Sequence, residues 1–258
     1  MLYCRYKYFG QDVLCKVRRM KKMVNKWKLA QKIELDVWKE VENKIPFGPE
    51  ILIKRAKIIY SWLQFFTNLN QESKVLEIGG AGMPVVDYFP NCIKYGTDPL
   101  VHFYRNMFYN LLSPETLYFT SIVEQIPLKK ESFHAVIALN VIDHCLYPKK
   151  TIDEIYRIMK PGGILILSVD VYAKIINILQ KIRIRAGVVR NNDTLHPWRF
   201  TLPEILKMLR SKFTPLNVYM SVYDPLSMGK KSGWPLKSGL VAKIRSEQRT
   251  ILYRENIS

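Results

Sequence analysis

A glycine-rich turn directly after a short apolar segment is the first feature of the chain suited to binding a ligand. Residues 74–78 are mostly apolar, which predicts a buried parallel strand, and Glu77 lies near its end. Small residues follow, and they let a ligand lie close to the backbone. These residues are Gly79, Gly80, Ala81 and Gly82. Pro84 comes next, at a position that favours the start of a helix.

A second acidic position stands at the end of the next predicted strand. Asp98, followed by Pro99, comes after Gly79 at the spacing of roughly 20 residues at which an open α/β sheet places a carboxylate beside a ribose. The turn does not fit the G-x-G-x-x-G pattern of dinucleotide-binding proteins, because Ala81 or Val85 stands where a glycine is required. An ordinary tight turn is the alternative, although such a turn needs one glycine rather than three.

Three further motifs follow in order along the chain. Residues 124–128 read EQIPL, residues 132–144 read SFHAVIALNVIDH and residues 156–163 read YRIMKPGG. Together with the glycine turn and Asp98, they resemble the class I S-adenosylmethionine-dependent methyltransferases of the type 11-like group, which carry LPF, SFD and LKPGG motifs. The resemblance implies an α/β fold with a Rossmann-like, doubly wound, mostly parallel seven-stranded sheet and an N-terminal helical extension. It is specific for the fold and the cofactor, but not for the methyl acceptor.

The resemblance also implies which residues bind S-adenosylmethionine. An ionised Asp98 can accept hydrogen bonds from both ribose hydroxyls, and Glu77 supplies negative charge near the ammonium group. In the family, the residue at Asn140 meets the methionine end through its backbone. Ile122 stands where the family usually has an acid near the adenine, so Glu124 is an alternative partner there. The expected cofactor residues are Glu77, Gly79, Gly80, Ala81, Gly82, Asp98, Pro99, Ile122 and Asn140.

A hydroxyl acceptor would require a general base. His144 is the first candidate because the ordinary pKa of histidine is near neutrality, and Asp143 could orient it, although adjacent residues on a helix point apart. The alternative is that Asp143 caps a turn and His144 only lines the cleft. His196 is the second candidate base, and His134 is expected to have a structural role at the start of a strand. We expect no metal site.

The positive charge of the chain is concentrated in its flanks. The net charge is +18, to which residues 1–60 contribute +9, residues 61–170 contribute −2 and residues 171–258 contribute +11. Such a field attracts anionic partners: a phosphate-bearing acceptor, nucleic acid or an anionic membrane surface. The alternative is that the charge only maintains solubility. The residues expected to hold an anionic acceptor are Arg185, Arg190, Arg199, Lys230 and Lys231.

The sequence divides into a basic arm (1–23), a helical cap (24–66) and a methyltransferase domain (67–258). It shows neither an apolar run long enough to span a membrane nor a leader, and its four cysteines form no C-x-x-C pair. We therefore predict a cytoplasmic protein, with peripheral contact at the inner membrane surface left open. Helices are expected at residues 24–43, 50–66, 85–89, 101–112, 148–159, 171–184 and 201–209. Further strands are expected to end at residue 98 and to cover residues 117–122, 133–140, 164–169, 216–222 and 239–244.

Three function classes are consistent with these features. The first is a methyltransferase that acts on a small or glycan-type acceptor, including an anionic one. The second is an RNA or DNA methyltransferase, which the charge favours, although residues 140–143 read NVID where an amino-methylating enzyme would carry its Asn/Asp-Pro-Pro-Tyr/Phe tetrad. The third is a non-catalytic adenosyl-binding protein at a membrane surface.

Overall fold

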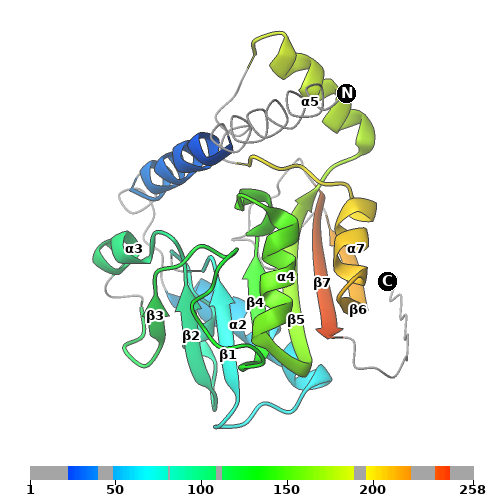
Figure 1. Cartoon of the computed structure of the whole chain (residues 1–258). Coiled ribbons are helices and arrows are strands. Elements are labelled where there is room, and N and C mark those ends of the chain that lie inside the picture. Colours follow the sequence, from blue (N-terminus) through cyan, green and yellow to red (C-terminus); the bar gives the residue numbers. More distant parts are fainter. Residues whose placement is uncertain are drawn as a thin grey trace, which may run out of the picture.

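A seven-stranded sheet forms the centre of the computed structural model, which describes residues 23–39, 49–80, 82–108, 112–188, 196–221 and 236–244 (Figure 1). The strands are β1 (Lys74–Ile78), β2 (Ile93–Thr97), β3 (Leu117–Phe119), β4 (Phe133–Leu139), β5 (Met159–Val171), β6 (Phe213–Ser221) and β7 (Leu236–Ile244). Their order across the sheet is β3-β2-β1-β4-β5-β7-β6. The first five are parallel, whereas β7 runs antiparallel to β5 and to β6.

Helices precede the sheet and connect its strands. Residues 23–39 are helical. The other α-helices with described bounds are α2 (Pro49–Phe66), α3 (Val101–Met107), α4 (Pro148–Ile158), α5 (Lys174–Arg185) and α7 (Leu202–Arg210). Two short 3-10 helices are η1 (Val86–Tyr88) and η2 (Ile142–His144). The start of α7 carries the expected capping box, in which the backbone N–H of Thr201 donates to Glu204 Oε2 at 2.7 Å.

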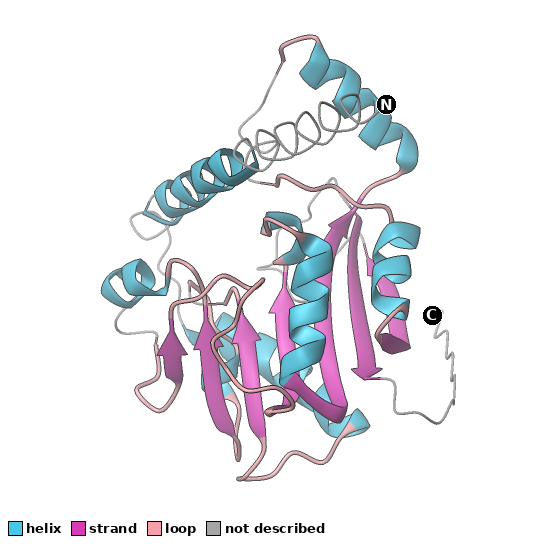
Figure 2. Ribbon diagram, in the orientation of Figure 1, coloured by secondary structure: helices cyan, strands magenta, loops and turns pink. Residues whose placement is uncertain are grey.

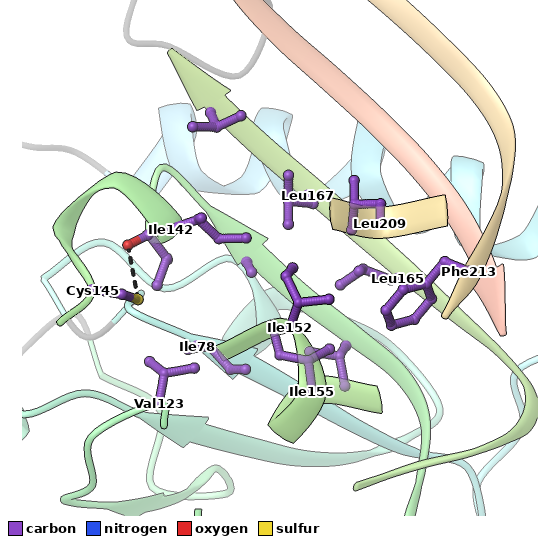
Figure 3. Close-up of a cluster of buried hydrophobic side chains, with 14 of the residues drawn as sticks. Ile78, Val123, Ile142, Cys145, Ile152, Ile155, Leu165, Leu167, Leu209 and Phe213 are labelled. Atoms are coloured by element: carbon purple, nitrogen blue, oxygen red, sulfur yellow. Dashed lines mark hydrogen bonds between the residues drawn. The ribbon is translucent and has the colours of Figure 1, made fainter. Parts of the chain in front are cut away.

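Helices cover both faces of the sheet (Figure 2). Alternate residues of a strand point to opposite faces, so neighbouring residues join different cores. Leu76 and Val136 pack in the cluster that contains α4 and α7, whereas Val75 and Ala135 pack with α2. Figure 3 shows the first of these clusters, in which residues of α4 and α7 lie over β5. The result is a three-layer α/β structure with N-terminal helices, which confirms the predicted fold class at this level.

The strand order creates a crevice between β1 and β4. These two strands are neighbours in the sheet, although β2 and β3 separate them in the chain. The connection after β1 therefore leads outward in one direction, and the connection after β4 leads outward in the other. Open α/β sheets bind ligands outside the carboxyl ends of the strands at such a switch point. The glycine turn and Asn140 follow the two strands that flank it.

The structure corrects several expected boundaries. The helix expected at 85–89 is only the 3-10 turn η1, because Phe89 precedes Pro90 and takes an extended conformation with ψ 130°. The strand expected at 117–122 ends at Phe119, and the helix expected at 101–112 is regular only to Met107. β5 begins at Met159 rather than at residue 164. A bulge opposite β4 accommodates the extra residues, and Gly162, with φ +77°, permits it.

Candidate active site

A cavity of about 410 Å³ lies at the carboxyl ends of β1, β2 and β4. Of the predicted site residues, it brings together Glu77, Gly79, Gly80, Gly82, Asp98, Pro99, Ile122, Asn140 and His144. Ala81 lies outside the described residues. The cavity also includes residues that the sequence did not assign to the cofactor site, among them Trp27, Gln31, Glu34, Trp38, Arg55, Tyr104 and His196. Four of these come from the helical residues 23–39, which therefore form one wall.

The glycine turn is required by its surroundings. Gly79 has a φ of +72°, and a Cβ atom at this position would lie 2.6 Å from Val141 Cγ2. A Cβ atom on Gly80 would overlap the carboxyl group of Glu77. Side chains at these two positions would be strained or would displace their neighbours, so bare backbone is exposed toward the cavity.

Glu77 connects the glycine turn to the short helix that follows it. Its side chain is only 2% exposed, and Oε2 accepts backbone hydrogen bonds from Val85 at 2.8 Å and Val86 at 2.9 Å. Burial raises the pKa of Glu77 to about 7, although these hydrogen bonds and the charge of Arg55 oppose the shift. A positively charged ligand group nearby would therefore favour the ionised form of Glu77.

Asp98 is a second buried acid at the same end of the sheet. Its Oδ1 accepts the backbone N–H of Leu100 at 2.7 Å. Burial raises the pKa of Asp98 to about 7, and the negative charge of Glu34 adds to this effect. Glu34 is itself held by Trp38, whose Nε1 donates to Glu34 Oε1 at 2.9 Å. The cavity thus gathers acidic side chains from β1, from β2 and from the N-terminal helix.

Asn140 turns the chain at the end of β4. It has a φ of +58°, a left-handed conformation that asparagine tolerates better than most residues. Its backbone N–H is bound to Ser168, at 2.9 Å from the carbonyl oxygen and 3.1 Å from Oγ. Its Nδ2 lies 3.5 Å from His144 Nε2. Asn140 therefore joins the cofactor side of the cavity to the histidines.

Asp143 lies near two histidines and is closer to His196, the second candidate base, than to His144. Its Oδ2 is 2.6 Å from His196 Nδ1 and 3.9 Å from His144 Nε2. The two imidazole rings are 4.4 Å apart between centroids. His144 Nδ1 also lies 3.8 Å from Glu34 Oε2. The pairing that we expected, Asp143 with His144, is thus the longer of the two contacts.

The charges of this cluster determine where the proton lies. Burial alone would raise the pKa of Asp143, but His144 and the hydrogen bond from His196 outweigh it and hold the pKa below its usual value. Burial would lower the pKa of His196, but the hydrogen bond to Asp143 and its negative charge raise it. An ionised carboxylate can only accept, so His196 Nδ1 donates. In the neutral imidazole, Nε2 is then the atom that can accept a proton.

Backbone contacts hold the segment that carries His196. Val171 and Phe200 form a parallel bridge, and the N–H of Tyr172 donates to the carbonyl of Phe200 at 2.8 Å. Trp198 donates from its backbone to the carbonyl of Asp143 at 3.2 Å and from Nε1 to that of Cys145 at 2.7 Å. The chain thus returns after α5 to place His196 beside a residue 53 positions earlier. The polar HPWR sequence at 196–199 was the only sign of this in the sequence.

The remaining predicted residues occupy distinct positions. Glu124 lines the cavity, but its Oε1 accepts the backbone N–H of Tyr147 at 2.8 Å, so it supports a loop. His134 accepts the backbone N–H of Lys74 at 2.9 Å, which fits the structural role expected for it. The guanidinium of Arg199 lies 4.5 Å from the centre of the Tyr172 ring. Arg185 is exposed on α5, whereas Arg190, Lys230 and Lys231 lie outside the described residues.

A sequence comparison identifies a domain in the middle of the chain. Residues 98–167 match the model of a methyltransferase domain family. The chain contains an S-adenosylmethionine-dependent methyltransferase domain. S-adenosylmethionine is therefore the cofactor of this methyltransferase, as its motifs predicted. No curated protein sequence matches the chain significantly.

Solved structures share the fold of this methyltransferase. A putative methyltransferase from Bacillus halodurans is 18% identical with a TM-score of 0.54, covering 71% of this chain and 97% of that chain. A SAM-dependent methyltransferase from Methanosarcina mazei is 16% identical with a TM-score of 0.52, covering 72% and 96%. The [4+2]-cyclase SpnF is 18% identical with a TM-score of 0.51, covering 72% and 80%. Identities this low establish the fold alone. Among the described residues, no helix has the length and apolar character needed to cross a membrane.

Proposed function

We propose that this methyltransferase transfers a methyl group to a hydroxyl of a small or glycan-type acceptor, with His196 as the general base. One observation carries this proposal: His196, which is bound to Asp143 at 2.6 Å, lines the same cavity as the acids Glu77 and Asp98, whereas Asp143 lies behind it. A base is needed for a hydroxyl, because a neutral alcohol is a weak nucleophile until its proton is removed.

The cavity suits the cofactor. When bound, S-adenosylmethionine supplies a methyl group activated by a sulfonium cation. In this proposal Asp98 accepts hydrogen bonds from the ribose hydroxyls and Glu77 supplies negative charge behind the glycine turn, which their positions in the cavity support. Gly79 and Gly80 leave room for contact with the backbone, and Asn140 closes the cofactor site next to the histidines. Gly82, Pro99 and Ile122 line the same cavity, and Ala81 is included by resemblance to the family.

The two histidines receive different roles in this proposal. His196 Nε2 accepts the acceptor proton while Nδ1–H stays bonded to Asp143, so the carboxylate stabilises the imidazolium that forms. His144 lines the cavity between Asn140 and Glu34, where it orients the acceptor. Asp143 is thus a positioning residue for His196, rather than for His144 as first expected.

The N-terminal helix limits the size of the acceptor. Trp27, Glu34 and Trp38 come from residues 23–39 and line the cavity opposite the strand ends. A volume of about 410 Å³ is near the lower end of typical ligand sites, which span roughly 300–1,000 Å³. This space suits a small molecule, or the end of a glycan, together with the cofactor. Arg55 also lines the cavity and is a candidate to contact an anionic acceptor.

The division into an arm (1–23), a cap (24–66) and a methyltransferase domain (67–258) is part of the same proposal. In the described part of the cap, residues 24–39 form a wall of the cavity, and α2 contributes Arg55 to it. In α2, Ile59 and Leu63 are fully buried against the sheet, so this helix also belongs to the core of the domain. A cytoplasmic location remains a prediction.

The proposal can be tested by offering classes of acceptor to the purified chain with methyl-labelled S-adenosylmethionine. The classes are sugars, sugar phosphates, phenols, amines and RNA. We expect label in a hydroxyl-bearing small molecule. The variant His196→Ala should lose this transfer but keep cofactor binding, whereas His102→Ala, which changes an exposed histidine on α3, should behave as the wild type.

Three results would contradict the proposal. Efficient methylation of RNA would favour the nucleic-acid class instead. Transfer to an amine that does not depend on His196 would remove the need for a base. Binding of the labelled cofactor without transfer to any acceptor class would favour the non-catalytic alternative.

A further inference from the structure

The helix α5 carries an apolar stripe that faces solvent. Ile175, Ile178, Leu179 and Ile182 are 58%, 44%, 54% and 57% exposed, respectively. They recur at the i, i+3, i+4, i+7 spacing that places side chains on one face of a helix. No residue of α5 is buried. In Figures 1 and 2 the helix lies at the top of the view, beyond the carboxyl ends of the strands.

The less exposed face of α5 is mixed in character. Ile176, Asn177, Gln180 and Arg183 are half-buried, so one isoleucine and three polar residues lie on the more protected part of the helix. A helix that packs on a protein core normally directs its apolar face inward. In α5 four of the apolar side chains point to solvent instead, so packing against the described residues does not explain the stripe.

Basic side chains flank the stripe. Lys174, Lys181 and Arg185 are exposed on α5, and the helix contains no acidic residue. An exposed apolar stripe between basic residues is the pattern of helices that lie in the plane of a membrane surface, with aliphatic side chains in the lipid and basic groups near the headgroups. We propose that α5 binds an anionic membrane surface through Ile175, Ile178, Leu179 and Ile182.

A second copy of the chain is a poorer partner for this surface. A helix of 12 residues is about 18 Å long and about 10 Å wide, so the stripe offers on the order of 200 Å². A stable protein interface buries roughly 800 Å² on each side. Two copies joined through α5 would also bring their basic residues together, whereas anionic lipids provide charge of the opposite sign.

Nucleic acid fits the stripe less well than lipid does. Single-stranded nucleic acid is bound by basic residues together with aromatic side chains on which bases stack. α5 contains no aromatic residue, and its exposed side chains between the basic ones are aliphatic. Binding of RNA would use the charges of α5 but would leave its apolar stripe in water.

The connections of α5 place the proposed membrane contact near the cavity. Only Tyr172 and Ala173 separate the carboxyl end of β5 from α5. The chain then returns through His196 to the bridge at Phe200. Membrane binding would therefore bring the cavity edge of the sheet toward the lipid surface. This inference does not depend on the identity of the acceptor.

The test is co-sedimentation of the full chain with vesicles of phosphatidylcholine alone and with about one third phosphatidylglycerol. We expect binding to the anionic vesicles only. The double variant Ile178→Ser/Leu179→Ser should weaken it at least about tenfold, since each fully buried aliphatic side chain contributes about that factor or more. Phe65→Ser is the matched control, because it removes a side chain that is 79% exposed on α2 and should leave binding unchanged.

Other outcomes would overturn the inference. Binding that survives the α5 double variant but is lost in Lys21→Ala/Lys22→Ala would assign the contact to the N-terminal arm. A wild-type dimer that the α5 variant converts to a monomer, without vesicle binding, would assign the stripe to self-association. If the chain bound RNA equally well with and without Leu179, and did not bind vesicles, α5 would contact RNA through its basic residues and the apolar stripe would have no role in binding. Methyl transfer can be measured on the same variants, so failure here is distinct from failure of the proposed reaction.

Discussion

Buried carboxylates lie at or beside both ends of the cavity, but only at the histidine end do positive partners outweigh the effect of burial on the pKa. At the cofactor end, burial raises the pKa of Glu77 and of Asp98 to about 7, and Glu34 adds negative charge beside Asp98. At the histidine end, Asp143 is equally buried, yet His144 and His196 hold its pKa below the usual value. The first end is electrostatically incomplete without a cationic or hydrogen-bonding ligand. At the second end, the two histidines already supply positive partners to Asp143 Oδ2, and Asp143 Oδ1 has no hydrogen-bond partner among the described residues.

This difference predicts that variants at the histidine end will affect turnover, whereas variants at the cofactor end will affect binding. A carboxylate that already has a partner gains little from a ligand, but it determines the tautomer and the pKa of its histidine. A carboxylate whose pKa is raised by burial is stabilised in its charged form when a ligand binds to it. Its removal should therefore weaken ligand binding. The four predictions below separate these two behaviours.

The largest effect is expected at the histidine end. His196→Ala should lower kcat by about 10²–10⁴-fold, the usual contribution of a general base, with little change in cofactor affinity. Asp143→Asn removes the charge that raises the pKa of His196, so the acidic limb of the pH–rate profile should move to lower pH. Steady-state kinetics across pH would measure both effects.

His144→Ala serves as the comparison for this prediction. His144 is 3.9 Å from Asp143, so we expect its removal to change kcat less than removal of His196 does. A larger loss in His144→Ala, with a normal pH–rate profile in Asp143→Asn, would return the role of base to His144.

The next largest effect is expected at the cofactor end. Asp98→Asn keeps an oxygen for the N–H of Leu100 but loses the negative charge. A hydrogen bond to a charged group contributes about 1.5–3 kcal/mol, so affinity for S-adenosylmethionine should fall about 10- to 150-fold per lost bond. Calorimetric titration would measure this, with Asp36→Asn as an exposed control on the N-terminal helix. Unchanged affinity would show that the ribose is not at Asp98.

The gathering of the cofactor-end residues was largely predictable because each of them lies at or just after the carboxyl end of a parallel strand. The glycine turn follows β1, Asp98 follows β2 and Asn140 follows β4, and the carboxyl ends of parallel strands meet at one edge. Local rules of backbone conformation are sufficient for features of this kind. The helix expected at 85–89 was wrong in type and length, because Pro90 keeps Phe89 extended and only the 3-10 turn η1 forms.

The histidine end and the cavity wall were not predictable in the same way. The contact between Asp143 and His196 joins residues 53 positions apart and depends on how the chain returns after α5. An amphipathic pattern in residues 24–43 indicated a buried face, but it does not specify what that face covers. That Trp27, Glu34 and Trp38 close the cavity is a property of tertiary packing. Similarly, periodicity predicted α5, but not that its apolar side would face outward.

A smaller effect concerns the pH dependence of stability without cofactor. The folded-state pKa values of Glu77 and Asp98, about 7, exceed their ordinary values of 4.5 and 3.8. The stabilisation that these acids contribute is complete below about pH 4 and is lost as pH rises to about 7, because the folded state binds more protons in that range. We expect Tm to fall between pH 5 and 8. The fall should be shallower in Asp98→Asn, and a steady rise would contradict the burial argument.

The smallest effect is expected from removal of metal ions. One donor atom each from Asp143, His144 and His196 lies within 4.8 Å of the others, an arrangement that can hold a cation. Ligand atoms around a tetrahedral zinc ion at about 2.0–2.1 Å would be about 3.3 Å apart. The observed separations from Asp143 Oδ2 are 2.6 Å and 3.9 Å, so one contact is too short and the other too long. The first distance is that of a charge-assisted hydrogen bond.

We therefore expect a chelator to leave turnover unchanged. A stoichiometric metal found by mass spectrometry, lost in His144→Ala and required for turnover, would instead make this cluster a metal centre.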